Sequence, residues 1–296
     1  MAGLMSRLPG FGRRSIISLS IEGNDLRLVC VTGKEIVRFA SHTLDPDAMP
    51  GGMVTNPTVF GHALRAILAE SDIPRGTWIV GFPDSDACSR ILNLTKDSRL
   101  AVADMVRREM RRDPFLASNE YRLFHQVVEE KTTEIKVFVL AVRRAALTGF
   151  LEGLRIAGIA PRLVELRPLA LIRAINQPHT IIANVERTFV DVIIVSNYLP
   201  MIMRSVPLPE DNTATTEIVN ELKRTIDSYN GDHQVQLKAR LPLVLTGEMS
   251  SRPDLVDALT NGLQRPVVGP GCPFIAPPGF AVESFVVNLG LILKAR

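Results

Sequence analysis

Hydrophobic and polar positions follow a similar order in two blocks of the chain. In the first block, apolar stretches over 16–21, 26–31 and 35–43 with turn residues between them predict three consecutive β-strands, followed by a helix in "PTVFGHALRAILAES". The second block begins at Thr180, where "TIIANVE", "FVDVIIVS" and "LPMIMRSVPL" predict three more strands before a helix over 213–229. This repetition predicts two similar α/β lobes that face each other.

Helices and strands of a different order separate the two blocks. "SRLAVADMVRREMRR" predicts a helix, "YRLFHQVVEE" and "EIKVFVLAVR" predict a pair of strands, and "AALTGFLEGLRIAGI" predicts a second helix. We therefore expect a first lobe over 1–96, an inserted α+β subdomain over 97–165, and a second lobe over 166–296. The last apolar stretch predicts a helix over 280–293 that can pack back on the first lobe.

The composition excludes several classes of protein. The chain of 296 residues is 46% hydrophobic, and its 34 basic against 31 acidic residues give a net charge of only +3, which is too balanced for a dedicated nucleic-acid-binding protein. The three cysteines and five histidines lack metal-ligand spacing, so no metal site is expected. No apolar run approaches the roughly 18 residues needed to span a bilayer. We expect a cytoplasmic protein.

Several longer stretches resemble one known family. They are "FVLAVRRAALTGFLEGLRIAGIAPRLVELRPLALIRAI", "VNELKRTIDSY", "LVLTGEMSSRPDLVDALTNGLQRPV" and "PFIAPPGFAVESFVVNLGLILK". Along nearly its whole length the chain resembles the PilM-like proteins, which are actin-like cytoplasmic proteins of type IV pilus assembly and are similar to the cell-division protein FtsA. The resemblance implies an α/β, actin-like (ribonuclease H-like) fold with two lobes and an inserted subdomain.

The same resemblance locates the positions where a nucleotide would bind, and the expected residues are missing there. PilM-like proteins have an Asp-hydrophobic-Gly turn in each lobe and a glycine pair near the adenosine. Here these positions correspond to Ser20, Glu22 and Gly23 in the first hairpin, Asn184 and Glu186 in the second, and Gly247 with Glu248 at the third. A helical segment that usually precedes "VNELKRTIDSY" is also largely absent.

Three glutamates at these positions would disfavour ATP. A carboxylate about 4 Å from a phosphate costs roughly 1 kcal/mol in water and roughly 4 kcal/mol at an effective dielectric constant of 20. Two or three such groups outweigh the roughly 8 kcal/mol of a micromolar complex. We therefore expect no ATP or Mg²⁺ cofactor and no enzyme activity, and we expect Arg27, Arg187 and Arg204 to pair with the glutamates. There are two alternatives: a single such glutamate can be a solvated turn residue, or the register of a short hairpin can slip by one.

The segment "RREMRR" places arginines at i,i+4 on one predicted helix, which costs a few tenths of a kcal/mol for each like-charge pair. One interpretation is a docking face for an acidic partner or anionic lipid headgroups; the other is a solvated face with carboxylates nearby. The resemblance implies that this subdomain borders the groove for the N-terminal peptide of PilN. The predicted partner-binding residues are Arg107, Arg108, Arg111, Pro114 and Phe115.

Taken together, the residues and the resemblance predict a non-catalytic scaffold. We expect a cytoplasmic adaptor, peripheral at the inner membrane, that binds the N-terminal tail of a PilN-like membrane protein and links a pilus or secretion platform to a PilO-like protein and to cytoplasmic pilus ATPases. The alternatives are a divergent ATP-binding actin-like ATPase and an FtsA-like filament protein of cell division.

Overall fold

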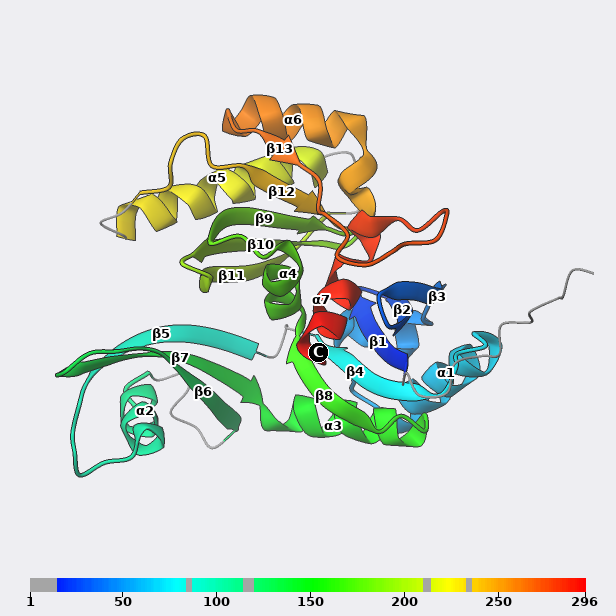
Figure 1. Cartoon of the computed structure of the whole chain (residues 1–296), viewed down its shortest axis with the longest axis horizontal. Coiled ribbons are helices and arrows are strands. Elements are labelled where there is room, and N and C mark those ends of the chain that lie inside the picture. Colours follow the sequence, from blue (N-terminus) through cyan, green and yellow to red (C-terminus); the bar gives the residue numbers. More distant parts are fainter. Residues whose placement is uncertain (1–14, 84–86, 114–119, 210–213, 233–235) are drawn as a thin grey trace, which may run out of the picture.

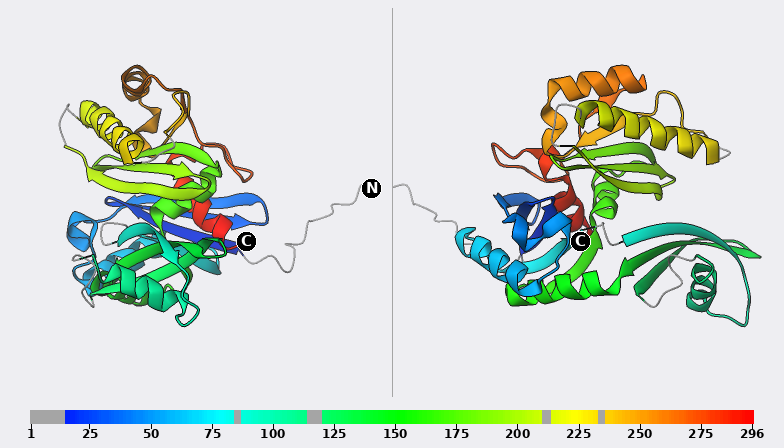
Figure 2. Two further views of the ribbon diagram at one scale, coloured as in Figure 1. Left: turned by 90° about the vertical axis from the view of Figure 1, so that its left-hand side faces the viewer. Right: turned by 180° about the vertical axis from the view of Figure 1, so that it is seen from behind.

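The computed structural model describes residues 15–83, 87–113, 120–209, 214–232 and 236–296. Two lobes lie one above the other, and a smaller subdomain projects from the first lobe (Figure 1). Two further views show the same arrangement from the side and from behind (Figure 2). Within the described residues, no helix has both the length and the apolar character needed to cross a membrane.

The first lobe is a five-stranded sheet with two helices on one face. β1, β2 and β3 form an antiparallel meander, and β4 and β8 join β1 in parallel, giving the order β3-β2-β1-β4-β8. The helices approach closely because Gly61 and Gly153 lie at their contact, where a Cβ atom on Gly153 would fall 2.3 Å from the Phe60 ring. The elements are β1 (Ser15–Glu22), β2 (Asp25–Thr32), β3 (Glu35–Thr43), α1 (Pro57–Glu70), β4 (Gly76–Phe82), α3 (Arg144–Ile156) and β8 (Pro161–Leu166).

The second lobe repeats the connectivity of the first. Its sheet has the order β11-β10-β9-β12-β13, with an antiparallel meander followed by parallel strands, and two helices cover the outer face. The repetition predicted from the hydrophobic pattern is therefore confirmed. The elements are β9 (His179–Val185), β10 (Phe189–Ser196), β11 (Leu199–Pro207), α5 (Ala214–Asp232), β12 (Leu243–Thr246), α6 (Pro253–Leu263) and β13 (Val267–Val268).

Two helices, α4 (Arg167–Ile175) and α7 (Val286–Lys294), lie between the sheets and bury apolar residues of both lobes. They touch through Gly290, where a Cβ atom would fall 1.9 Å from the carbonyl oxygen of Ala170. The helix predicted over 280–293 begins only at Val286. The preceding residues differ because Phe280 and Phe285 turn inward and pack against Phe39, with ring centroids 5.2 and 5.7 Å away.

The subdomain consists of a three-stranded antiparallel sheet and one helix. The sheet has the order β5-β7-β6, and α2 covers one of its faces with Met105, Val106 and Met110. The subdomain predicted over 97–165 therefore has different bounds in the structure. β5 precedes residue 97 but pairs with β7 in the subdomain sheet, whereas α3 and β8 belong to the first lobe. The elements are β5 (Ala87–Thr95), α2 (Val102–Met110), β6 (Tyr121–Glu130) and β7 (Glu134–Arg143).

Candidate interlobe site

The turns of the two equivalent hairpins meet between the lobes. β1 ends at Glu22, and the two-residue turn of Gly23 and Asn24 leads into β2. Gly23 has a φ of 66°, which favours glycine. A Cβ atom on Gly23 would lie 3.0 Å from the hydroxyl of Thr188 in the β9–β10 turn. The turns of the two hairpins are therefore in close contact with each other.

Arg27 on β2 forms a buried ion pair across this contact. Its Nη1 and Nη2 atoms donate to the two carboxylate oxygens of Glu186 at 2.9 and 2.6 Å, a bidentate geometry that joins the first lobe to the second. Nη1 also donates to the carbonyl oxygen of Ser284 at 2.9 Å and lies 3.2 Å from Glu22. The side chains of Arg27, Glu186 and Glu22 are at most 3% exposed. We call these three residues the interlobe clamp.

Two carboxylates therefore share one buried guanidinium group. Burial and the charge of Glu22 raise the pKa of Glu186 to about 8, against the hydrogen bond from Arg27, which favours the charged form. Burial lowers the pKa of Arg27, but the charge of Glu22 and the hydrogen bond to Glu186 outweigh it, so this pKa is raised. Burial beside Glu22 therefore favours the neutral form of Glu186, whereas the bidentate contact with Arg27 favours its charged form.

Polar side chains from both sheets form the floor beneath the clamp. The Nδ2 atom of Asn184 donates to Glu22 at 3.4 Å and to Asp191 at 3.2 Å, and its Oδ1 accepts from Thr246 at 2.9 Å. Ser20 lies 3.0 Å from both a Glu22 oxygen and Asn288 on α7. All of these groups are buried between two apolar cores. Their mutual hydrogen bonds offset the cost of removing them from water.

The third predicted position, Gly247 with Glu248, lies at the end of β12. Gly247 has a φ of 94°, and a Cβ atom there would fall 2.3 Å from the carbonyl oxygen of Val185, so only glycine fits. Glu248 accepts from Arg187 at 3.0 Å and lies 3.9 Å from Arg27. The hydrogen bond from Arg187 lowers the pKa of Glu248. The three glutamates predicted from the sequence are thus brought together around Arg27.

The predicted pairing of arginines with these glutamates is confirmed for Arg27 and Arg187 but wrong for Arg204. Arg204 lies on β11 and pairs with Glu221 of α5 at 3.1 Å. The side chain of Arg204 lies on the face of the sheet that α5 covers, so it meets Glu221 there. Glu221 is buried and has Arg224 as its second partner.

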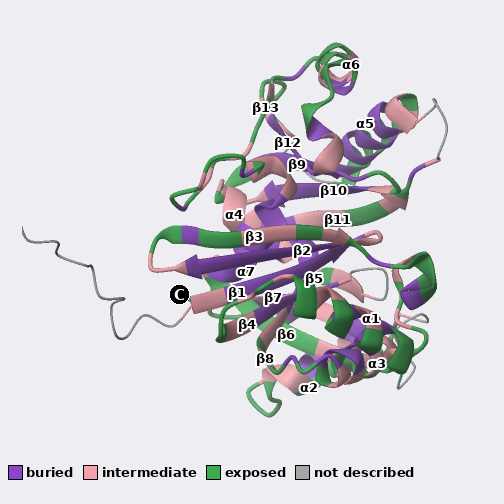
Figure 3. Ribbon diagram, turned by 90° about the vertical axis from the view of Figure 1, so that its right-hand side faces the viewer, coloured by how far each residue is buried: buried purple, intermediate pink, exposed green. Residues whose placement is uncertain are grey.

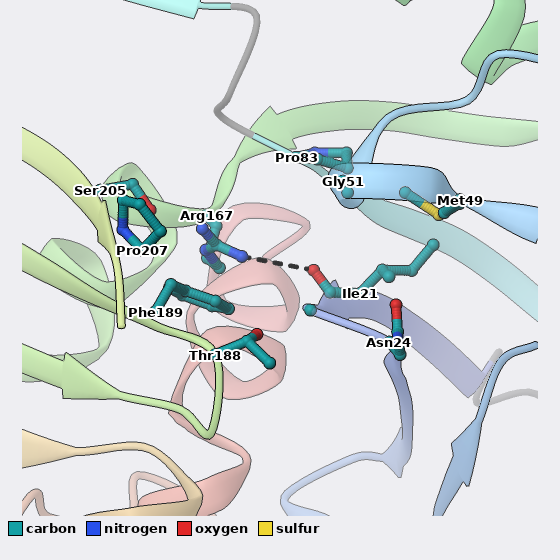
Figure 4. A pocket seen from close by; sticks show the side chains of 12 residues that line it. Ile21, Asn24, Met49, Gly51, Pro83, Arg167, Thr188, Phe189, Ser205 and Pro207 are labelled. Atoms are coloured by element: carbon teal, nitrogen blue, oxygen red, sulfur yellow. Dashed lines mark hydrogen bonds between the residues drawn. The ribbon is translucent and has the colours of Figure 1, made fainter. Parts of the chain in front are cut away.

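A pocket of about 620 Å³ lies beside the clamp, between the lobes (Figure 4). Gly23 and Asn24 of the first hairpin, Thr188 and Phe189 of the second, and the glycines of the 50–52 turn line it. Among the described residues that line the pocket, Arg167 carries the one charged side chain. Its guanidinium group stacks on Phe189, 4.3 Å from the ring centroid, and pairs with Asp191 at 3.1 Å. The volume is within the range of small-molecule sites.

The arginines of α2 lie far from this interlobe site. Arg107, Arg108 and Arg111 are exposed on the outer surface of α2, and Arg107 pairs with Asp104 at 3.2 Å. Pro114 and Phe115 are outside the described residues. The interpretation of a solvated face expected carboxylates near these arginines, and α2 itself provides them in Asp104 and Glu109.

Comparison with known proteins adds evidence on the fold. No family model matches the sequence, and no curated protein does. Among solved structures, a chain of a PilM–PilN type IV pilus biogenesis complex superposes with a TM-score of 0.80 at 20% identity, covering 96% of this chain and 99% of that one. A Bacteroides thetaiotaomicron protein with an actin-like ATPase fold gives a TM-score of 0.54 at 10% identity, with 95% and 96% covered.

The chain has an actin-like fold. The cytoplasmic domain of EpsL, an inner-membrane component of the type II secretion system of Vibrio cholerae, shares it with a TM-score of 0.54 at 12% identity, covering 95% of this chain and 94% of that one. The predicted fold class is therefore confirmed. The actin-like fold explains why two equivalent hairpins meet at the interlobe site.

Sequence reasoning missed three participants in the site of this actin-like fold. Arg167 begins α4, Asp191 is the third residue of β10, and Asn288 is the third residue of α7, where it donates to the carbonyl oxygen of Arg27 at 3.0 Å. Each is a polar residue within an otherwise apolar stretch. A buried polar residue in such a stretch needs a hydrogen-bond or ion-pair partner. The sequence therefore offered a signal for each of these residues.

Proposed function

We propose that this protein is a non-catalytic, actin-like scaffold of a type IV pilus or related secretion platform. In this proposal it is cytoplasmic, lies at the inner membrane, and holds the N-terminal tail of a PilN-like membrane protein. The support is the similarity in fold to a chain of a PilM–PilN complex and to the EpsL cytoplasmic domain, together with the interlobe clamp. The predicted contacts with a PilO-like protein and pilus ATPases remain predictions.

The interlobe clamp is the observation that carries the non-catalytic part of the proposal. A nucleotide's phosphates between the hairpins would meet Glu22, Glu186 and Glu248 and would have to displace a bidentate, buried Arg27–Glu186 pair. Breaking such a pair from one side typically costs about 3–5 kcal/mol. Among the described residues, no group of three or more histidine, cysteine, aspartate or glutamate side chains is arranged to hold a metal ion.

The subdomain sheet offers a docking face for the tail. Residues of β5, β6 and β7 alternate between a face covered by α2 and an open face, and Phe124, Leu140, Phe138 and Ile91 share the open face. Phe124 is 40% exposed, and Leu140 reaches the core of the first lobe. We call these four residues the open sheet face. An extended peptide can place alternate apolar side chains on it.

Tail binding is tested with peptides that correspond to the N-terminal tails of candidate PilN-like membrane proteins. Phe124→Ser should weaken binding at least tenfold by isothermal titration calorimetry, because a large apolar contact is lost. Val127→Ser is the matched control, since Val127 is 39% exposed on the same strand but on the other face. Failure of every pilus-type or secretion-type tail to bind would refute the adaptor function.

A second candidate function is nucleotide binding, and the pocket of about 620 Å³ beside Arg167 favours it. Differential scanning fluorimetry with Mg-ATP separates the two candidates. A ligand present at 100 times its dissociation constant stabilises a protein by about 2.7 kcal/mol. The scaffold proposal expects no shift of the melting temperature, whereas a clear shift that an Arg167→Gln substitution abolishes would favour the nucleotide-binding candidate.

A further inference from the structure

The subdomain carries an excess of positive charge. Residues 87–143 hold 11 basic and 8 acidic residues, an excess of three that equals the net charge of the entire chain. Residues 15–86, most of the first lobe, are acidic by contrast, with 5 basic and 9 acidic residues. The subdomain projects from the first lobe, so its charge is presented apart from the body of the molecule (Figures 1 and 2).

Within the subdomain, α2 presents most of this charge to solvent. Its apolar side is buried on the sheet, and four arginines are exposed on the outer side: Arg107, Arg108, Arg111 and Arg112. Two carboxylates oppose them on the same helix, Asp104 at 3.2 Å from Arg107 and Glu109 at 2.8 Å from Arg112. We call these four arginines the arginine face. Arg111 and Arg112 directly follow α2, and over residues 102–112 an excess of two positive charges remains.

The arginine face has opposing effects on the stability of α2. Arg107 with Arg111 and Arg108 with Arg112 are like-charge pairs at i,i+4, and each destabilises a helix by a few tenths of a kcal/mol. The two ion pairs of α2 are between residues three positions apart on an exposed surface, where such pairs stabilise little. The arginines lie at the C-terminal end of α2, where basic side chains interact favourably with the helix dipole, and their mutual repulsion offsets part of that gain.

The shape around the arginine face favours a broad anionic surface over a peptide. An extended peptide needs an apolar surface for its side chains, and the open sheet face that offers one is on the opposite side of the sheet from α2. Buried and exposed residues alternate along α2 itself (Figure 3). A convex helix with outward arginines instead presents its charges to a flat surface. Basic clusters of this kind are attracted to anionic lipid headgroups.

We propose that the arginine face of α2 docks on anionic phospholipid headgroups. The inference does not depend on tail binding, because the two faces are on opposite sides of one sheet. Each arginine near an anionic membrane strengthens binding roughly fivefold. Two excess charges give a weak contact by themselves, but the contact adds to any second attachment that holds the protein at the membrane.

The test is co-sedimentation of the full chain with vesicles of phosphatidylglycerol and phosphatidylethanolamine at low ionic strength, compared with vesicles of phosphatidylcholine alone. Binding to the anionic vesicles should fall roughly 25-fold in Arg108→Gln/Arg111→Gln, fivefold for each charge. Asp104→Asn should raise it roughly fivefold, because it removes an opposing carboxylate. Added salt should abolish the binding, because the contacts are solvent-exposed.

The matched control is Lys223→Gln/Arg240→Gln, which removes the same two charges from exposed positions of the second lobe. It should bind vesicles like the unmodified chain, and all variants should keep the circular dichroism melting curve. Equal loss in both double variants, equal binding to phosphatidylcholine, or no gain in Asp104→Asn would overturn the proposal. Retention on an immobilised acidic peptide without vesicle binding would overturn it in favour of a protein partner. A negative result here leaves tail binding to the open sheet face unaffected.

Discussion

Replacing Arg27 with methionine should destabilise the protein strongly by leaving two carboxyl groups of the interlobe clamp without their cation. Methionine fills much of the volume of the arginine stem, so the change removes charge and hydrogen bonds more than packing. Glu22 and Glu186 are 1% and 2% exposed, and water cannot replace the guanidinium group. Three bonds between Arg27 and the groups across the lobe boundary would be lost, two to Glu186 and one to the carbonyl oxygen of Ser284.

The magnitude follows from the burial of the pair. Removing one partner of a buried ion pair typically costs about 3–5 kcal/mol. In a chain of this size about 1 kcal/mol corresponds to roughly 2 °C in melting temperature, so we expect a decrease of roughly 6–10 °C. The decrease should be smaller at pH 5.5 than at pH 8.5, because Glu186 can take up a proton and lose its uncompensated charge at the lower pH.

The measurement is thermal unfolding followed by circular dichroism at both pH values. Arg38→Met is the control, because Arg38 pairs with Asp72 where the two side chains are 49% and 86% exposed, and such pairs contribute about 0–1 kcal/mol. A melting temperature of Arg27→Met within 2 °C of the control, or a decrease independent of pH, would refute the reasoning that a buried clamp joins the lobes.

Three further predictions concern the same region. The pKa of Glu186 is raised from 4.5 to about 8, so its contribution to stability is fully present below pH 4.5 and is lost as the pH rises through about 8. Glu186→Gln should therefore flatten the decrease of melting temperature between pH 6 and 9. An unchanged slope would contradict this assignment. Gly247→Ala should destabilise by several kcal/mol in urea titrations, whereas Gly269→Ala, which has open space at its Cβ position, should be nearly neutral; similar effects would count against the close approach. Gly290→Ala should separate α4 from α7 and lower the melting temperature at least as much as Gly247→Ala, because its Cβ would fall 1.9 Å from a carbonyl oxygen.

Much of the fold could be predicted from the order of apolar and polar positions. The two meanders are readable because short apolar stretches, buried on both faces of the sheet, are interrupted by turn residues, as at Gly23 between β1 and β2. The subdomain boundary was less accessible, because the pairing of β5 with β7 joins segments about 50 residues apart. The start of α7 was misplaced because Phe280 and Phe285 pack as a cluster with Phe39, and an apolar stretch alone does not reveal such packing.

The sequence by itself determined that glutamates occupy the three positions where a nucleotide-binding actin-like protein has glycine, because residue identity at a hairpin turn is local information. Only the tertiary structure decided what those glutamates do. Arg27 comes from one lobe and Glu186 from the other, and their 2.6 Å contact exists only once the two sheets face each other. Charge pairing depends on distance and burial, which a chain acquires only by folding, so the sequence pattern misassigned Arg204 and left Arg167, Asp191 and Asn288 unnoticed.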